Sequence, residues 1–321
     1  ARPQRQGQSL CEPVDQPVKP ALSVIFFTVS SGAGLGLLVW LLIASLMADH
    51  IRMDALTFYK GAAIAALLIT AGLISSTLHL ANRKNAVYSL TRWRTSWLSR
   101  EGLLAIALYP LAALHLYALD NGLPQVTPVT LWLLVALAIA IMFCTGMIYG
   151  CLKTIPRWNT WMTPAKYVLF GLMSGAVLLP AVLSLRPAEV GPVGKPMMAI
   201  LLLAIGMVFY VAYLLKHPRK THRINDALGF REGNVRLLDA GHSHGTFLTN
   251  EFGFVLAREQ ARLLRWVAII GGFVLPLLLC YFTKWFWAAS VICLIGLLVE
   301  RWLFFAEAEH VVRLYHGQQR V

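Results

Sequence analysis

The sequence predicts an all-α integral membrane protein with eight transmembrane helices, arranged as two four-helix bundles. The first observation is composition: 58% of the 321 residues are hydrophobic, only 13% are charged, and the mean hydropathy is +0.64, outside the usual range of soluble domains. The second is length, because a helix needs about 20 apolar residues to cross a hydrocarbon layer roughly 30 Å thick. Eight apolar segments meet that length.

In chain order, the predicted spans cover residues 22–47, 61–81, 101–119, 129–152, 164–185, 196–216, 263–282 and 285–305. Two spans carry small residues four apart, at Gly32 and Gly36 in the first and at Gly171 and Gly175 in the fifth. Such pairs let two helices approach closely, so they predict helix packing and not a nucleotide site.

Basic residues predict the orientation of the chain. Eight spans put both termini on one side, together with the loops after spans two, four and six, and this side holds 23 of the 28 Lys and Arg residues. The positive-inside rule therefore predicts that both termini face the cytoplasm. The net charge of +13 is concentrated on one side of the membrane, where it suits anionic lipid headgroups or an acidic partner. It does not indicate nucleic-acid binding.

The connections divide the chain further. The segment before the seventh span is polar, and loops longer than about 15 residues are usually functional or disordered. We expect residues 1–20 to form a cytoplasmic tail and not a signal peptide, because no short apolar region precedes a cleavage site. The other predicted parts are a first four-helix half (21–152), a linker with spans five and six (153–216), a long cytoplasmic docking loop (217–261), and spans seven and eight with a cytoplasmic C-terminal tail (262–321).

Metal-binding patterns are weak. No C-x-x-C pair occurs among the five cysteines, so we expect neither a disulfide framework nor a zinc or iron–sulphur site. His242 and His244 form a pair that could bind a metal, but no Cys or carboxylate cluster accompanies them, which favours a loop or partner contact. Motifs of soluble catalysis, such as a Walker loop or G-x-S-x-G, are absent from the sequence.

Ionisable residues within spans are functional candidates, because charge is costly in hydrocarbon. Glu101 opens the third predicted span, and His79 lies at the same level at the end of the second. Together they make a plausible proton-exchanging pair. A structural role fits the spacing equally well. The negative charge of Glu101 would favour a helix N-terminus through the helix dipole, and His79 would satisfy polar groups at a chain end.

Other ionisable residues favour structural roles. His115 lies 14 residues after Glu101, about 21 Å along a helix, so a bis-histidine haem would need His115 with an outer residue such as His50, and we do not expect one. The charged residues around the end of the last span predict helix capping or ion pairs; they are Glu300, Arg301, Glu307 and Glu309. A secondary transporter stays open as a different class, although the ionisable residues crowd one surface and not the midplane.

Four stretches carry a family resemblance: "PALSVIFFTVSSGAGLGLL" from Pro20, "STLHLANRKNAVYSLTRWRTSWLSRE" from Ser76, "IPRWNTWMTPAKY" from Ile155 and "FLTNEFGF" in the long loop. They resemble the membrane-anchor subunits of the dimethyl sulfoxide reductase family of molybdenum enzymes, and most of all the anchor of the membrane-bound sulfite dehydrogenase. The sequence departs from the reductase pattern at Arg100, before the glutamate, and at Asn82-Arg83.

The resemblance implies an eight-helix anchor in the bacterial cytoplasmic membrane. It would contact an iron–sulphur subunit directly and hold a molybdopterin subunit on the cytoplasmic side, with no haem or cluster of its own. It would pass electrons from sulfite oxidation to ubiquinone or menaquinone, although the anchor of a dimethyl sulfoxide reductase or acyl-CoA-type oxidoreductase would look similar. In the first half, the implied quinone and proton-transfer residues are His79, Glu101, Arg100, Arg83 and Trp97. Partner docking is expected at Arg92, Arg94, Lys153, Arg157, His242, His244 and Glu251.

Overall fold

The structure is a computed structural model that describes residues 22–47, 53–78, 90–186, 193–216, 224–225, 255–308 and 311. Within these ranges the chain forms helices and connecting turns, and no strand. Eight helices in the described part are long and apolar enough to cross a membrane, which confirms the predicted fold class.

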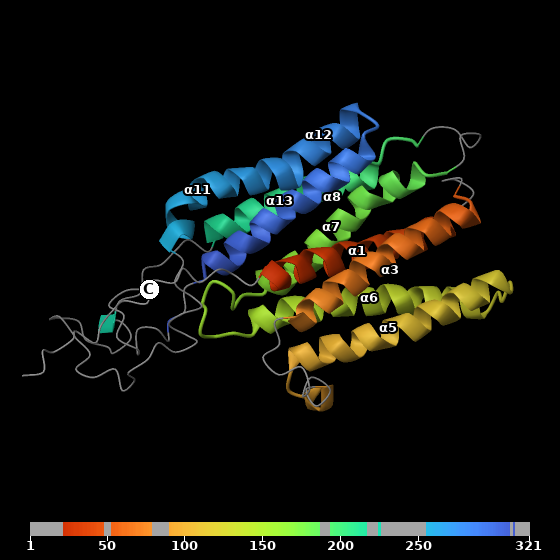
Figure 1. Ribbon diagram of the computed structural model, residues 1–321, viewed down its shortest axis with the longest axis horizontal. Coiled ribbons are helices and arrows are strands. Elements are labelled where there is room, and N and C mark those ends of the chain that lie inside the picture. The colour runs from red at the N-terminus through yellow and green to blue at the C-terminus, as the bar shows by residue number, and fades with distance from the viewer. Residues whose placement is uncertain are drawn as a thin grey trace, which may run out of the picture.

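The helices run along the length of the molecule (Figure 1). The first four spans are α1 (Leu22–Leu46), α3 (Ala55–Leu78), α5 (Trp97–Asp120) and α6 (Val126–Gly150), with the short 3₁₀ helix η2 (Leu90–Arg92) before α5. The next two are α7 (Met162–Leu183) and α8 (Met197–Lys216). The seventh combines α11 (Val255–Ile269), the π-helix η4 (Ile270–Val274) and α12 (Leu275–Phe282), and the eighth is α13 (Phe286–Ala306).

Among the helices that begin earlier than the hydropathy pattern predicts, two have polar side chains that cap them. The α3 helix begins at residue 55, where the carboxylate of Asp54 accepts the N–H of Thr57 at 3.2 Å. The α5 helix begins at residue 97, where the hydroxyl of Ser96 accepts the N–H of Ser99 at 3.4 Å. Caps of this kind satisfy the free N–H groups of a first turn, so each helix extends beyond its apolar segment.

Glycines bring α1 and α7 together at the centre of the bundle. Gly36 of α1 faces Gly171 of α7 so closely that a Cβ on Gly36 would clash with the carbonyl oxygen of Gly171. Gly175 meets the backbone of Gly36 in the same way. The small residues therefore form a helix crossing, which confirms the packing prediction.

Apolar side chains fill the interior and also cover the outside. One buried cluster joins α1, α3, α5 and α6 with part of α7, and a second joins α7, α8, α11, η4, α12 and α13. Large apolar residues such as Leu67 and Val208 are 68% and 64% exposed on outward helix faces. This distribution suits a protein whose surroundings are hydrocarbon.

The helices alternate in direction, so turns collect at two ends of the bundle. We call the end that carries residues 90–96 and 151–161 the basic end, because Arg92, Arg94 and Lys153 are exposed there. The α5 and α7 helices begin at the basic end, and α6 and α13 finish there. The candidate site residues that the structure describes all lie at this end.

Candidate functional site

Glu101 is a buried carboxyl near the basic end of the first half. It lies in the second turn of α5, beyond the capped first turn, and is only 3% exposed. Its carboxylate accepts a hydrogen bond from the hydroxyl of Thr145 on α6. The side chain is therefore directed at the neighbouring helix α6.

Thr145 has two acceptors for one hydroxyl hydrogen. Its Oγ1 lies close to the carboxylate of Glu101 and also 3.0 Å from the carbonyl oxygen of Ile141, four residues earlier on α6. A hydroxyl carries one hydrogen and two lone pairs. When Glu101 is ionised, Thr145 can donate to its carboxylate. When Glu101 carries a proton, Thr145 can donate to the carbonyl oxygen of Ile141 in its own helix.

Glu101 differs from the other buried glutamates in the groups that its carboxylate contacts. Glu300 and Glu307 are 1% and 5% exposed, and each of them forms ion pairs. Within the described part of the chain, no Lys, Arg or His lies within ion-pair distance of the Glu101 carboxylate. Glu101 is thus a buried carboxyl whose hydrogen bond comes from a neutral group.

Trp97 and Arg100 lie in the first turn of α5, next to Glu101. The guanidinium of Arg100 stacks 4.2 Å from the centre of the Trp97 ring. It also donates to the carbonyl oxygens of Trp93 at 2.8 Å and Arg94 at 2.7 Å. Arg100 therefore fixes the turn that leads into α5, and the structure brings Trp97, Arg100 and Glu101 together at one helix end.

The predicted docking residues that the structure describes occupy two environments. Arg92, Arg94 and Lys153 are exposed at the basic end. Arg157 is different, because its side chain is only 10% exposed and its Nη1 lies 2.7 Å from the Glu307 carboxylate. Five other predicted site residues lie outside the described residues: His79, Arg83, His242, His244 and Glu251.

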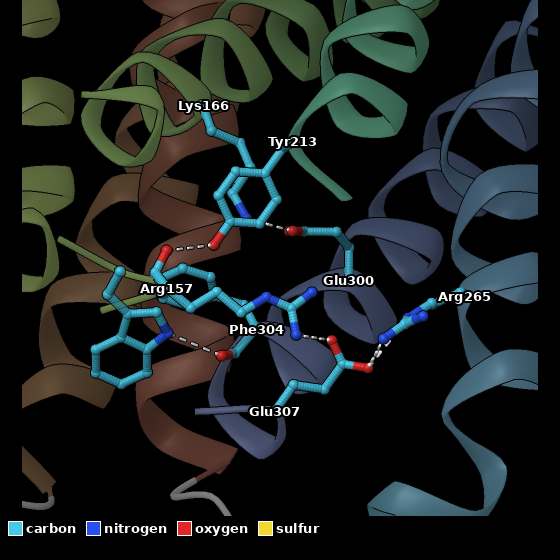
Figure 2. A network of polar contacts seen from close by, with 8 residues as sticks. Arg157, Lys166, Tyr213, Arg265, Glu300, Phe304 and Glu307 are labelled. Carbon is cyan, nitrogen blue, oxygen red and sulfur yellow. Dashed lines mark hydrogen bonds and ion pairs between the residues drawn. The ribbon is translucent and has the colours of Figure 1, made fainter. Parts of the chain in front are cut away.

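A network of buried charges ties the helices of the second half together at the basic end (Figure 2). Lys166 of α7, with 0% exposure, donates to the carboxylate of Glu300 on α13 at 2.7 Å. The ammonium of Lys166 also lies 4.3 Å from the ring centres of Tyr213 and Phe304. Arg301 lies 3.4 Å from the second oxygen of Glu300. The carboxylate of Glu300 is therefore neutralised by two cations inside the protein.

Glu307 anchors the second part of this network. Its carboxylate pairs with Arg157 from the α6–α7 connection and with Arg265 of α11, at 2.7 Å in each case. The hydroxyl of Tyr213 on α8 donates to the carbonyl oxygen of Arg157 at 3.1 Å, and the indole N–H of Trp158 donates to the carbonyl oxygen of Phe304 at 3.0 Å. Figure 2 shows these groups converging from several elements.

Sequence reasoning found part of this network. The predicted ion pairs of Glu300 and Glu307 are confirmed, and Glu309 lies outside the described residues. Lys166 was missed, although a lysine within a predicted apolar span was a usable signal. Its partner is 134 residues away along the chain, so spacing could not identify the pair.

His115 is buried near the other end of α5. Its Nδ1 lies 2.9 Å from the hydroxyl of Thr130 on α6, and the side chain is 2% exposed. Within the described part of the chain, His, Cys, Asp and Glu side chains form no group of three or more that could hold a metal. The geometry thus assigns His115 to the packing of α5 against α6.

Comparison with known proteins supplies the family. A family model described as "DMSO reductase anchor subunit (DmsC)" matches residues 18–306. The chain is 31% identical to a sulfite dehydrogenase subunit of Allochromatium vinosum, over 92% of this chain and 98% of that protein. It is 32% identical to the anaerobic dimethyl sulfoxide reductase protein YnfH of Escherichia coli, over 43% of this chain and 49% of that one.

A second reductase protein is similar over a comparable length. It belongs to the anaerobic dimethyl sulfoxide reductase of Haemophilus influenzae and is 27% identical over 50% of this chain and 58% of its own length. No solved structure matches the chain. Eight spans, the residues matched by the family model and the nearly full-length relative agree, so the chain belongs to the family of DMSO reductase anchor subunits.

Proposed function

We propose that this anchor subunit passes electrons from an iron–sulphur partner subunit to membrane quinone, within a complex whose molybdopterin subunit oxidises sulfite to sulfate. Similarity to the Allochromatium vinosum protein, which covers nearly the whole of both chains, supports sulfite as the donor. The reductase proteins match only about half of this chain or less. Molybdenum and iron–sulphur clusters would be held by the partners.

Glu101 is the observation on which the quinone site depends. Quinone reduction consumes two protons with two electrons, so the site needs a group that can deliver protons within the membrane. A buried carboxyl beside a neutral hydroxyl is such a group, because no cation of the described residues forms an ion pair with it. The ion-paired Glu300 and Glu307 lack this freedom.

Thr145 supports proton exchange by Glu101 in both protonation states. When Glu101 is ionised, Thr145 donates its hydroxyl hydrogen to the carboxylate. When Glu101 is protonated, its O–H can donate to Thr145 Oγ1, while Thr145 donates to the carbonyl oxygen of Ile141, 3.0 Å away. Because a hydrogen bond persists in either state, the proton can leave without stranding a buried polar group.

His79 would bind a quinone oxygen in this proposal. It follows directly after α3, which finishes at the end of the bundle where α5 begins. Trp97 and Arg100 would border the pocket, with Arg83 supplied by the same connection. The basic end would face the cytoplasm, because it belongs to the side that carries 23 of the 28 Lys and Arg residues.

The test replaces Glu101 by glutamine in the complete complex. Glu101→Gln keeps the shape and a hydrogen bond to Thr145 but cannot carry the proton. Sulfite oxidation coupled to quinone should fall by about 10²- to 10⁴-fold, the range lost when a general acid–base group is removed. Sulfite oxidation with a soluble artificial acceptor such as ferricyanide should be unchanged.

Asp120→Asn is the matched control, because Asp120 lies at the other end of the same helix and bonds Tyr59 there. It should leave both activities intact. Unchanged quinone coupling in Glu101→Gln would refute the proton-transfer role. A complex that reduces dimethyl sulfoxide with quinol, and does not oxidise sulfite, would instead overturn only the substrate and the direction of electron flow.

A further inference from the structure

A groove of about 880 Å³ runs between α6 and α7 at the basic end. Most of its wall is apolar, and polar residues occur only toward the α6–α7 connection. Four lining residues, Ile139, Phe143, Met147 and Gly150, belong to α6, and Ala165 is among those of α7.

The groove lies on the outer side of α6, away from Glu101. Its α6 residues are spaced four, four and three apart, at 139, 143, 147 and 150, which places them on one helix face. Thr145, which bonds Glu101, lies about 160° to 200° around the helix from Phe143 and Met147. The groove and the bond between Thr145 and Glu101 therefore use opposite faces of α6, although the ring of Phe143 in the groove wall also packs against Trp97, with 6.0 Å between the ring centres.

Hydrocarbon must fill most of this groove when the protein is in a membrane. Phe143 in its wall is 42% exposed, and the neighbouring wall of α7 presents Val168, Leu169 and Leu172. These residues belong to the membrane-spanning parts of α6 and α7. An extended aliphatic chain suits a long apolar groove that is open to the bilayer.

The end of the groove nearest the connection is polar and positively charged. Trp161, 66% exposed, forms this end together with Asn159 and Thr160. The ammonium of Lys216, the last residue of α8, lies 5.8 Å from the centre of the Trp161 ring. Tryptophan with an adjacent lysine at a span end is typical of the headgroup level of a bilayer.

We propose that this groove binds an anionic phospholipid, with one acyl chain along α6 and α7 and the phosphate beside Lys216. The α6–α7 connection, which carries Trp161, also carries the exposed Lys153. Charge complementarity selects an anionic headgroup over a zwitterionic one. The carbonyl oxygens of a quinone could accept a hydrogen bond from Lys216, but they are uncharged, so they would gain less from the ammonium than a phosphate does.

The experiment measures lipid binding to the purified full-length chain by native mass spectrometry in detergent. The probes are dioleoyl phosphatidylglycerol and dioleoyl phosphatidylcholine, which share acyl chains and differ in headgroup charge. The wild-type chain should retain phosphatidylglycerol at several-fold lower concentration than phosphatidylcholine. Lys216→Gln should weaken phosphatidylglycerol binding about fivefold, as expected for one cation at a membrane surface, and leave phosphatidylcholine unchanged.

Two further variants separate the groove from the headgroup contact. Ala165→Trp fills the groove and should abolish binding of both lipids, whereas Val208→Trp places the same ring on an exposed face of α8 outside the groove and should change neither. Lys195→Gln is the control for charge, because Lys195 also lies over an aromatic ring, 4.4 Å from Tyr281, away from the groove. It should bind phosphatidylglycerol as the wild type does.

Three results would overturn the proposal. One is equal binding of the two lipids by the wild-type chain, and another is unchanged phosphatidylglycerol binding in Lys216→Gln. The third is displacement of phosphatidylglycerol by a long-tailed quinone at equimolar concentration, which would identify the occupant as a quinone tail. None of these outcomes depends on Glu101, so lipid binding and quinone coupling can fail separately.

Discussion

At the residue scale, three buried glutamates show how environment assigns different roles to one side chain. Glu300 and Glu307 each have two cationic neighbours, whereas Glu101 has the hydroxyl of Thr145. A buried charge is costly unless it is paired. The paired carboxylates therefore fix the positions of helices, whereas the hydrogen bond from neutral Thr145 suits the proton exchange that we propose for Glu101.

The pair between Lys166 and Glu300 makes a prediction about stability. Lys166→Met leaves Glu300 with the more distant Arg301 alone, so the free energy of unfolding should fall by about 3–5 kcal/mol, as when one partner of a buried ion pair is removed. Unfolding of the purified chain in mixed micelles would measure the change.

The double variant Lys166→Met with Glu300→Gln is the control for this prediction. It should recover only part of the loss, because the unpaired carboxylate is gone but the buried Arg301 is left with aromatic neighbours such as Tyr167, whose ring centre lies 3.7 Å from the guanidinium. A single variant as stable as the wild type would show that the pair does not hold α7 against α13.

At the element scale, the contact between α1 and α7 joins the two sets of helices. Trp40 of α1 donates its indole N–H to the carbonyl oxygen of Leu172 on α7 at 2.7 Å, close to the crossing of Gly36 with Gly171. Backbones can approach this closely only where side chains are absent. The crossing therefore depends on glycine at particular positions of each helix.

Two substitutions on α1 test the crossing. Gly36→Ala introduces a Cβ that clashes with the backbone of α7, whereas a Cβ at Gly32, one turn earlier, lies 3.8 Å from the Cα of Gly171 in ordinary contact. Gly36→Ala should cost about 1–3 kcal/mol of unfolding free energy, the usual cost of overpacking, and Gly32→Ala should be nearly neutral. Equal stability of the two variants, measured by unfolding in mixed micelles, would contradict the glycine crossing.

At the scale of the whole molecule, charge and burial both concentrate at the basic end. Exposed Arg92, Arg94 and Lys153 lie there, together with Glu101 and the network around Glu300. A partner that docks on this end would therefore approach the proposed quinone site. The proposal thus requires the basic end to face the compartment of the iron–sulphur subunit.

Orientation can be tested by labelling engineered cysteines in a cysteine-free background with a membrane-impermeant maleimide. Lys153→Cys should react only in inverted membrane vesicles and Lys195→Cys only in intact spheroplasts, because the two positions lie at opposite ends of the bundle. Labelling of Lys153→Cys should fall several-fold when the partner subunits are expressed with the anchor. The reverse labelling pattern would refute a cytoplasmic docking face.

Much of the fold could be predicted because it follows from local chemistry. Apolar length specified eight spans, and the two glycine pairs indicated where helices pack closely. Helix starts at residues 55 and 97 differed from the prediction, because hydropathy detects the membrane interior while capping side chains determine where a helix begins.

By itself, the sequence determined the membrane class, the uneven distribution of basic residues and the family, since composition, span length and motifs are local properties of the chain. Only the tertiary structure decided which buried carboxylates are paired. Glu101 meets Thr145 across 44 residues and Lys166 meets Glu300 across 134, so neither contact follows from spacing. Helix packing sets the distance from each carboxylate to the nearest cation, and in a medium of low dielectric constant that distance decides whether the carboxylate forms an ion pair.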